Sequence, residues 1–247
     1  GICGGGVFAW DDHGHLPWTL VHHDYQWSRR FDGEAAMLDG ARLVTPQGIT
    51  IETIGSGTAY RLTYERPGLA FDVRFDATVS AEMSAAPAAE SGVFRGHIDQ
   101  PGRYTGWVRV GPDTLAVDCH CIRDRSWGPR GDDVTDMHFG YFHATASARD
   151  AFMIVMRADR DSEHFAPISG YLIRDGVRAA LGEGALGRSL EAEGHSLSHV
   201  AVQVQPGMFN WSSLARWRFG DATAYGELQD TWHPDAYRAF AREWSRP

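Results

Sequence analysis

The chain has 247 residues, of which 43% are hydrophobic and 12% aromatic, so it is long enough for one large all-β unit or two smaller domains. Its formal net charge of −9 argues against a nucleic-acid partner, because phosphate binding needs a basic surface. No apolar run approaches the roughly 20 residues that a membrane-spanning helix needs. The three cysteines, Cys3, Cys119 and Cys121, do not suggest a disulfide framework, and we expect a reducing, cytoplasmic location.

Residues 1–40 are rich in glycine, histidine and tryptophan and have poor periodicity, so we expect short strands joined by loops. Clear strand signals follow. Apolar and polar residues alternate over 49–53, 60–65 and 69–76, with Gly-Ser-Gly and Pro-Gly turns between them. This pattern predicts a three-stranded antiparallel meander with one apolar and one charged face.

Residues 80–92 are small and polar without alternation, which is typical of a linker. We therefore predict two domains, 1–92 and 93–247, and expect the first to be incomplete because the chain begins abruptly. In the second domain strands resume at 94, with a turn predicted at Pro101-Gly102 and a hairpin at Asp175-Gly176. Apolar residues four apart over 234–244 predict one short C-terminal helix in an otherwise all-β sandwich or barrel.

Two runs, from His97 to Gly106 and from Arg123 to Arg130 with an Asp-x-x-Trp-Gly core, resemble the AttH-like and hydroxyneurosporene-synthase-like proteins. The resemblance implies two lipocalin-like antiparallel β-barrels or half-barrels in one chain. That family includes carotenoid hydratases and pericyclic cyclases. The resemblance therefore also implies cofactor-independent hydration, dehydration, isomerisation or cyclisation of a hydrophobic isoprenoid-like or polyketide-like molecule.

The strand that enters the second run places Asp118, His120 and Asp124 on one face. A carboxyl group in apolar surroundings has a raised pKa and can protonate carbon, so Asp124 is the leading candidate acid. Asp118 or His120 are alternatives, and Arg125 would orient the acid. The same residues fit a structural latch in which Asp124 pairs with a neighbouring arginine, and both interpretations stay open.

Phe139, Tyr141 and His143 share one face of another predicted strand and could line a pocket, with Tyr141 or His143 as a proton carrier. The same pattern suits a core strand with polar groups near its end. Glu227 and Asp230 are further candidate carboxylates on a late strand, although a solvated strand face explains them as well. The predicted substrate-binding residues are Trp107, Trp127, Phe139, Tyr141 and Phe142.

Two other function classes fit the composition. A non-catalytic carrier of a lipophilic ligand would need the same hydrophobic interior. A metal-dependent enzyme would use the histidine-rich start, but no recognised metal spacing is present, and we predict neither a metal nor a cofactor. The predicted partner is a hydrophobic small molecule, and a homodimer is compatible with the sequence. The metal alternative rests on Asp11, Asp12, His13, His15, His22, His23 and Asp24.

Overall fold

The computed structural model describes residues 2–3, 26–27, 37–39, 41–44, 48–81, 83–84, 96–127, 138–158, 164–182, 190–205 and 208–244. The chain divides into two compact units, one made of residues 1–81 and 102–120 and the other of residues 82–101 and 121–247. Antiparallel strands and one C-terminal helix make up the described elements, so the all-β prediction is confirmed. Within the described ranges, no helix is long and apolar enough to cross a membrane.

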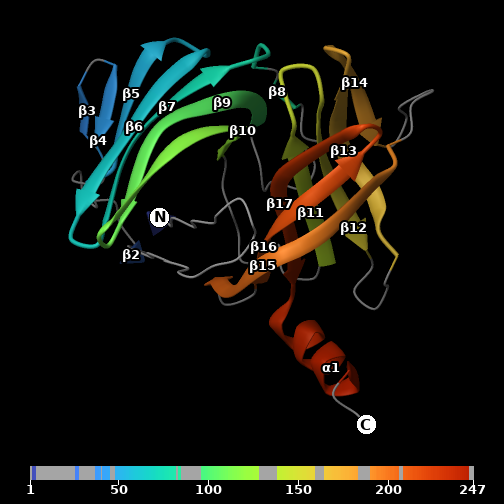
Figure 1. The fold of residues 1–247 in the computed structure, drawn as a ribbon. Coiled ribbons are helices and arrows are strands. Elements are labelled where there is room, and N and C mark those ends of the chain that lie inside the picture. The colour runs from blue at the N-terminus through green and yellow to red at the C-terminus, as the bar shows by residue number, and fades with distance from the viewer. Residues whose placement is uncertain are drawn as a thin grey trace. The chain divides into compact units, whose positions relative to one another are not determined.

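The first unit contains the predicted meander. Its main sheet has the order β10-β9-β7-β6-β5-β4-β3, which can be followed in Figure 1, and β1 and β2 form a separate pair. The strands are β1 (Ile2–Cys3), β2 (Gln26–Trp27), β3 (Met37–Asp39), β4 (Arg42–Val44), β5 (Thr50–Gly55), β6 (Ala59–Arg66) and β7 (Leu69–Ala77), with parts of β9 (Gly96–Val110) and β10 (Asp113–Trp127).

Alternation explains why β5, β6 and β7 form this sheet. On one face Leu69 is only 2% exposed and packs with Tyr64 and Val110. On the other, the guanidinium of Arg61 donates two hydrogen bonds to Asp72, at 2.8 and 2.5 Å. Full burial of a large apolar side chain is worth about 1.5–3 kcal/mol, whereas such exposed ion pairs contribute little. The apolar face therefore holds the meander together, as its sequence pattern predicts.

The second unit is built on a sheet of order β14-β13-β12-β11-β17-β16-β15. The predicted hairpin joins β13 to β14, and Asp175 and Gly176 have the positive φ angles, 56° and 78°, that such a tight turn requires. The predicted helix is α1 (Pro234–Trp244). The remaining elements are β8 (Met83–Ser84), β11 (His138–Thr145), β12 (Ala151–Ala158), β13 (Ala166–Arg174), β14 (Val177–Gly182), β15 (Ala192–Gln205), β16 (Met208–Phe219) and β17 (Ala222–Trp232).

The turn predicted at Pro101-Gly102 is wrong, because β9 runs through both residues. Pro101 lies between the residues of β9 that pair with β8 and those that pair with β7. Proline is tolerated where a strand changes partners, since it has no N–H to donate. Gly102 is required for a different reason: a Cβ there would lie 2.1 Å from the ring of Phe75.

Candidate active site

Strand β11 contributes side chains to both faces of the second unit's sheet, one polar and one apolar. Successive side chains point to opposite faces, so Tyr141 and His143 lie on one face and Phe142 on the other. Pairing extends each face to the neighbouring strands. The polar face comprises Tyr141, His143, Tyr171, Ser212, Glu227 and Gln229, and the apolar face holds a core that includes Phe142, Ala144, Phe152, Leu172, Ala215 and Trp217.

A chain of polar contacts leads from the surface to Tyr141. The phenol donates a hydrogen bond of 2.6 Å to Oδ1 of Asp99, whose side chain is 1% exposed. Oδ2 of Asp99 contacts Nε2 of His97, and the other ring nitrogen lies 3.6 Å from Oδ1 of Asp124. Exposure rises along this series to 18% at His97 and 46% at Asp124. These four residues, here called the proton chain, can carry a proton between solvent and a buried phenol.

Burial raises the pKa of Tyr141 well above its ordinary value of 10.0, and the negative charge of Asp99 raises it further. Tyr141 is therefore a neutral phenol near pH 7 and keeps its proton for donation. Burial also raises the pKa of Tyr171, with a smaller contribution from Asp99. The guanidinium of Arg178 lies 4.2 Å from the centre of the Tyr171 ring and opposes that rise.

A histidine–glutamate pair lies beside the proton chain on the polar face. The rings of Tyr141 and His143 meet edge-on with centres 5.6 Å apart, and Nε2 of His143 lies 3.6 Å from Oε2 of Glu227. Oε1 of Glu227 accepts hydrogen bonds from Ser212 and from Gln229, the latter at 2.8 Å. Burial raises the pKa of Glu227, but His143 and these donors outweigh it, so the net shift is downward. Glu227 is thus an anion held against a buried imidazole.

Comparison with known proteins identifies the family. Residues 10–208 match the family model described as a domain of unknown function, DUF7064. The chain belongs to this family. No curated protein sequence matches the DUF7064 chain.

A solved structure confirms the lipocalin-like fold of this DUF7064 protein. A crystal structure of a protein provisionally identified as AttH, from Nitrosomonas europaea, aligns with a TM-score of 0.56 and 11% identity over 86% of this chain and 76% of that one. The structure of kievitone hydratase from Nectria haematococca aligns with a TM-score of 0.47 and 11% identity over 89% and 76%. At this identity the first likeness establishes the fold and leaves the reaction open.

The candidate acids of β10 fall into different surroundings. Asp124 belongs to the proton chain. Asp118 and His120 belong to the first unit, where Asp118 is 62% exposed and accepts two hydrogen bonds from Arg103, at 2.7 and 2.8 Å. That pairing, together with the nearby His120, lowers the pKa of Asp118. Arg125 is exposed, so its role in orienting the acid stays a prediction.

The predicted substrate-binding residues are also divided. Tyr141 is on the polar face, and alternation places Phe139 on the same side. Phe142 packs into the apolar core, with its ring centre 6.0 Å from that of Trp217. Trp107 is in the first unit, where Arg109 lies over its ring at 5.9 Å. Trp127 ends β10, and its side chain lies outside the described residues.

Three residues of the proton chain also have the composition of a metal site. His97, Asp99 and Asp124 offer ligand atoms within 4.8 Å of one another. However, the two carboxylates lie at opposite nitrogens of the His97 ring, whereas a single ion would bind one nitrogen. The arrangement therefore suits proton transfer better than metal binding. The N-terminal histidines and aspartates of the metal alternative lie outside the described residues.

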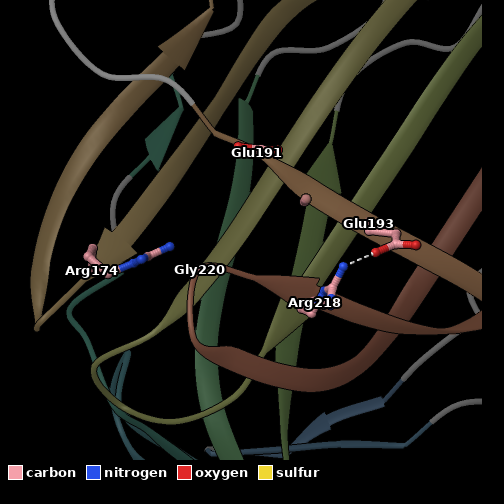
Figure 2. Close-up of a pocket in the computed structure, with 6 residues that line it drawn as sticks. Arg174, Glu191, Glu193, Arg218 and Gly220 are labelled. Atoms are coloured by element: carbon pink, nitrogen blue, oxygen red, sulfur yellow. Dashed lines mark hydrogen bonds and ion pairs between the residues drawn. The ribbon is translucent and has the colours of Figure 1, made fainter.

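Two other polar features of the second unit have structural explanations. Asp230 accepts a hydrogen bond of 2.7 Å from Nε1 of Trp232 and lies 2.7 Å from Nε2 of His138. Trp232 in turn packs, together with Phe209, against Tyr237 of α1. A separate hollow of about 670 Å³ lies in this unit, and Arg218 and Glu193 in its lining form an ion pair of 2.5 Å. Figure 2 shows the two side chains facing each other. The hollow's charged lining does not suit a hydrophobic ligand. It is lined by Arg174, Glu191, Ala192, Glu193, Arg218 and Gly220.

Sequence reasoning did not select His97, Asp99 or Tyr171 as site residues. His97 and Asp99 are two residues apart on a strand, so their side chains lie on one face, and this spacing could have identified them as a pair from the sequence. Their meeting with Tyr141 depends on packing between segments far apart in sequence, and no local pattern encodes it. The hydroxyl of Tyr171 has no hydrogen-bond partner in the described part of the chain, and this too depends on its surroundings in the fold.

Proposed function

We propose that this protein is a cofactor-independent enzyme that adds water to, or removes water from, a hydrophobic small molecule. The observation that carries the proposal is the hydrogen bond from buried Tyr141 to Asp99, which also contacts His97, whose other ring nitrogen lies 3.6 Å from exposed Asp124. A buried acid–base group needs such a route, because each turnover changes its protonation state. The AttH-like sequence motifs support the same reaction class.

Each residue of the proton chain has a role in the proposed reaction. In the hydration direction, the oxygen of water bonds to one carbon of a double bond while the other carbon gains a proton from His143, which regains it from solvent past Glu227. The proton that water loses passes to Tyr141 as its own proton moves to Asp99. His97 then transfers a proton to Asp124, and Asp124 exchanges it with solvent. Dehydration runs in reverse, and isomerisation or cyclisation would use the same groups.

The test uses isoprenoid-like and polyketide-like alkenes and alcohols in isotopically labelled water, with products identified by mass spectrometry. We expect conversion by the wild type and a loss of about 100-fold or more in Tyr141→Phe. Tyr225→Phe is the matched control, because Tyr225 is 42% exposed on a strand of the same sheet. Quenching of tryptophan fluorescence without conversion would support the lipophilic carrier instead.

A second pair of variants tests Asp124, the solvent-exposed end of the proton chain. Asp124→Asn should slow turnover about tenfold or more, because His97 loses the carboxylate that passes its proton to solvent. Asp118→Asn, on the same strand but paired with Arg103, should leave turnover unchanged. Equal rates for wild type and Asp124→Asn, with the fold retained, would remove Asp124 from the mechanism.

A further inference from the structure

The polar face carries buried polar atoms that lack a protein partner, among them one of His143 and one of Tyr171. Among the described residues, neither Nδ1 of His143 nor the hydroxyl of Tyr171 has a hydrogen-bond partner. His143 is 4% exposed and Tyr171 is 1% exposed. An unsatisfied buried polar group costs about 1–3 kcal/mol, so a ligand that hydrogen-bonds to these two atoms would gain affinity from them. The proton chain uses neither atom.

Strand register places both groups in one row. His143 of β11 is paired with Met153 of β12, and Met153 is paired in turn with Tyr171 of β13. On the other side of β11, His143 is paired with Glu227 of β17. Residues in register point to the same face. The row therefore reads carboxylate, imidazole, thioether and phenol across four adjacent strands.

Electrostatics ties this row to the proton chain. Tyr141 and Tyr171 each respond to the charge of Asp99, and Tyr171 also contributes to the pKa of Tyr141. The side chain of Glu227 is 33% exposed, so the row reaches solvent at its glutamate end. A base, two phenol donors and a route for protons thus occupy one polar face.

The Glu227 carboxylate decides which nitrogen of His143 is basic. An anion beside Nε2 favours the tautomer that carries its proton on Nε2, which leaves the lone pair on Nδ1. Nδ1 is also the atom of His143 that has no partner among the described residues. The imidazole is therefore oriented as a general base toward a ligand, in the manner of a histidine held by a carboxylate in other acid–base sites.

We propose that the substrate is a hydrophobic β-hydroxy ketone, or the enone formed from it, and that His143 is the base for its α-proton. This inference rests on the proposed function and names the substrate class of that site. The reason is chemical: an imidazole is too weak a base to remove a proton from carbon unless an adjacent carbonyl group acidifies that proton. The hydroxyl of Tyr171 would hydrogen-bond to the carbonyl oxygen, which gains negative charge as the proton leaves.

The atoms and electrons of this step balance without a further reactant. His143 takes the α-proton, and the electron pair of that bond forms the new carbon–carbon double bond. The bond to the β-oxygen breaks, and the departing hydroxyl takes a proton from Tyr141 and leaves as water. Tyr141 is reprotonated through Asp99, and the proton on His143 leaves past Glu227 to solvent. Hydration of the enone is the reverse.

The test separates the α-proton step from the loss of water. Benzylacetone is a hydrophobic ketone with no hydroxyl to lose, so exchange of its α-protons in heavy water needs His143 and Tyr171 but not the proton chain. We expect the full-length wild type to accelerate this exchange over buffer. His143→Gln and Tyr171→Phe should each reduce the acceleration about 100-fold, and Tyr141→Phe should retain it.

The exchange experiment has a control variant and a variant that checks folding, both at residues of this protein. His195→Gln removes an exposed histidine that also pairs with a glutamate, Glu193, at 3.4 Å, and should leave exchange unchanged. Tyr171→Phe guards against misfolding: its hydroxyl has no partner within the described ranges, so the melting temperature should hold or rise. Glu227→Gln keeps the shape of the side chain and should slow exchange by weakening the base.

The outcomes distinguish this inference from the proposed function. Wild-type exchange no faster than in buffer, or exchange that survives in His143→Gln, overturns the substrate class and the role of His143. The proposed function then stands if unactivated alkenes are hydrated in a Tyr141-dependent manner. Conversely, exchange of benzylacetone without conversion of the β-hydroxy ketone derived from benzylideneacetone would leave His143 active and remove the hydratase proposal.

Discussion

Asp99 and Asp118 are both hydrogen-bonded aspartates, but their burial differs greatly. Asp99 is 1% exposed and accepts the proton of Tyr141, while Asp118 is 62% exposed. We predict that Asp99→Asn lowers the free energy of unfolding by about 1–3 kcal/mol, because the buried phenol and the half-buried imidazole lose the carboxyl group that they contact. Urea denaturation measures this directly. Asp118→Asn is the comparison, and a similar unfolding midpoint for both variants would contradict the burial argument.

Glu227 gives the polar face a defined dependence on acid. Its folded-state pKa lies below the ordinary 4.5, so it contributes stability above that pH and loses it as the pH falls through the folded value. We predict that Glu227→Gln loses less stability than wild type on acidification below 4.5. Urea midpoints at neutral and acid pH provide the measurement. Parallel decreases in both proteins would show that the glutamate is not held as an anion.

The sequence identified part of this site at the residue scale. Tyr141 and His143 follow from alternation on a single strand, and Asp124 from sharing one strand face with Asp118 and His120. The partner of Tyr141, Asp99, lies on β9, and the partner of His143 lies on β17. Such contacts depend on which strands pair and how they pack, and a single sequence does not contain that information.

At the level of elements, close backbone contact holds β17 against the strand that carries His143. A Cβ at Gly226 would lie 1.9 Å from the carbonyl oxygen of His143. We predict that Gly226→Ala costs about 1–3 kcal/mol of unfolding free energy, because β11 must move away. Turnover should fall as well, since His143 moves with its strand. Thr223→Ala, exposed on the same strand, should change stability by less than about 0.5 kcal/mol, and equal effects would contradict the steric explanation.

Elements defined by local chemistry were predictable, and elements defined by their partners were not. The hairpin at Asp175-Gly176 and the helix α1 follow from turn residues and a four-residue apolar repeat. Pro101-Gly102 carries an equally strong local turn signal, yet β9 continues through it. Pairing with β7 from Gly102 onward outweighs the local preference there.

At the scale of the whole molecule, this continuity of β9 bears on the domain boundary. Sequence composition places the boundary after residue 92, which remains a prediction. The compact units are instead discontinuous: residues 102–120 group with the first unit, and residues 82–101 with the second. A linker-like composition shows where regular strand patterning is interrupted. Long strands that follow such a segment can still lead the polypeptide from one compact unit into the other.

The two divisions can be separated with a fragment of residues 93–247. In the full chain Gly102–Val110 pairs with Leu69–Ala77, and Phe75 packs against Tyr104 with ring centres 5.0 Å apart. The fragment lacks β7, so it exposes an unpaired strand edge and apolar side chains, which favour association between chains. We therefore predict that it aggregates while the full-length protein does not, as measured by size-exclusion chromatography with light scattering. A monomeric fragment with a cooperative melting transition would instead establish the boundary after residue 92.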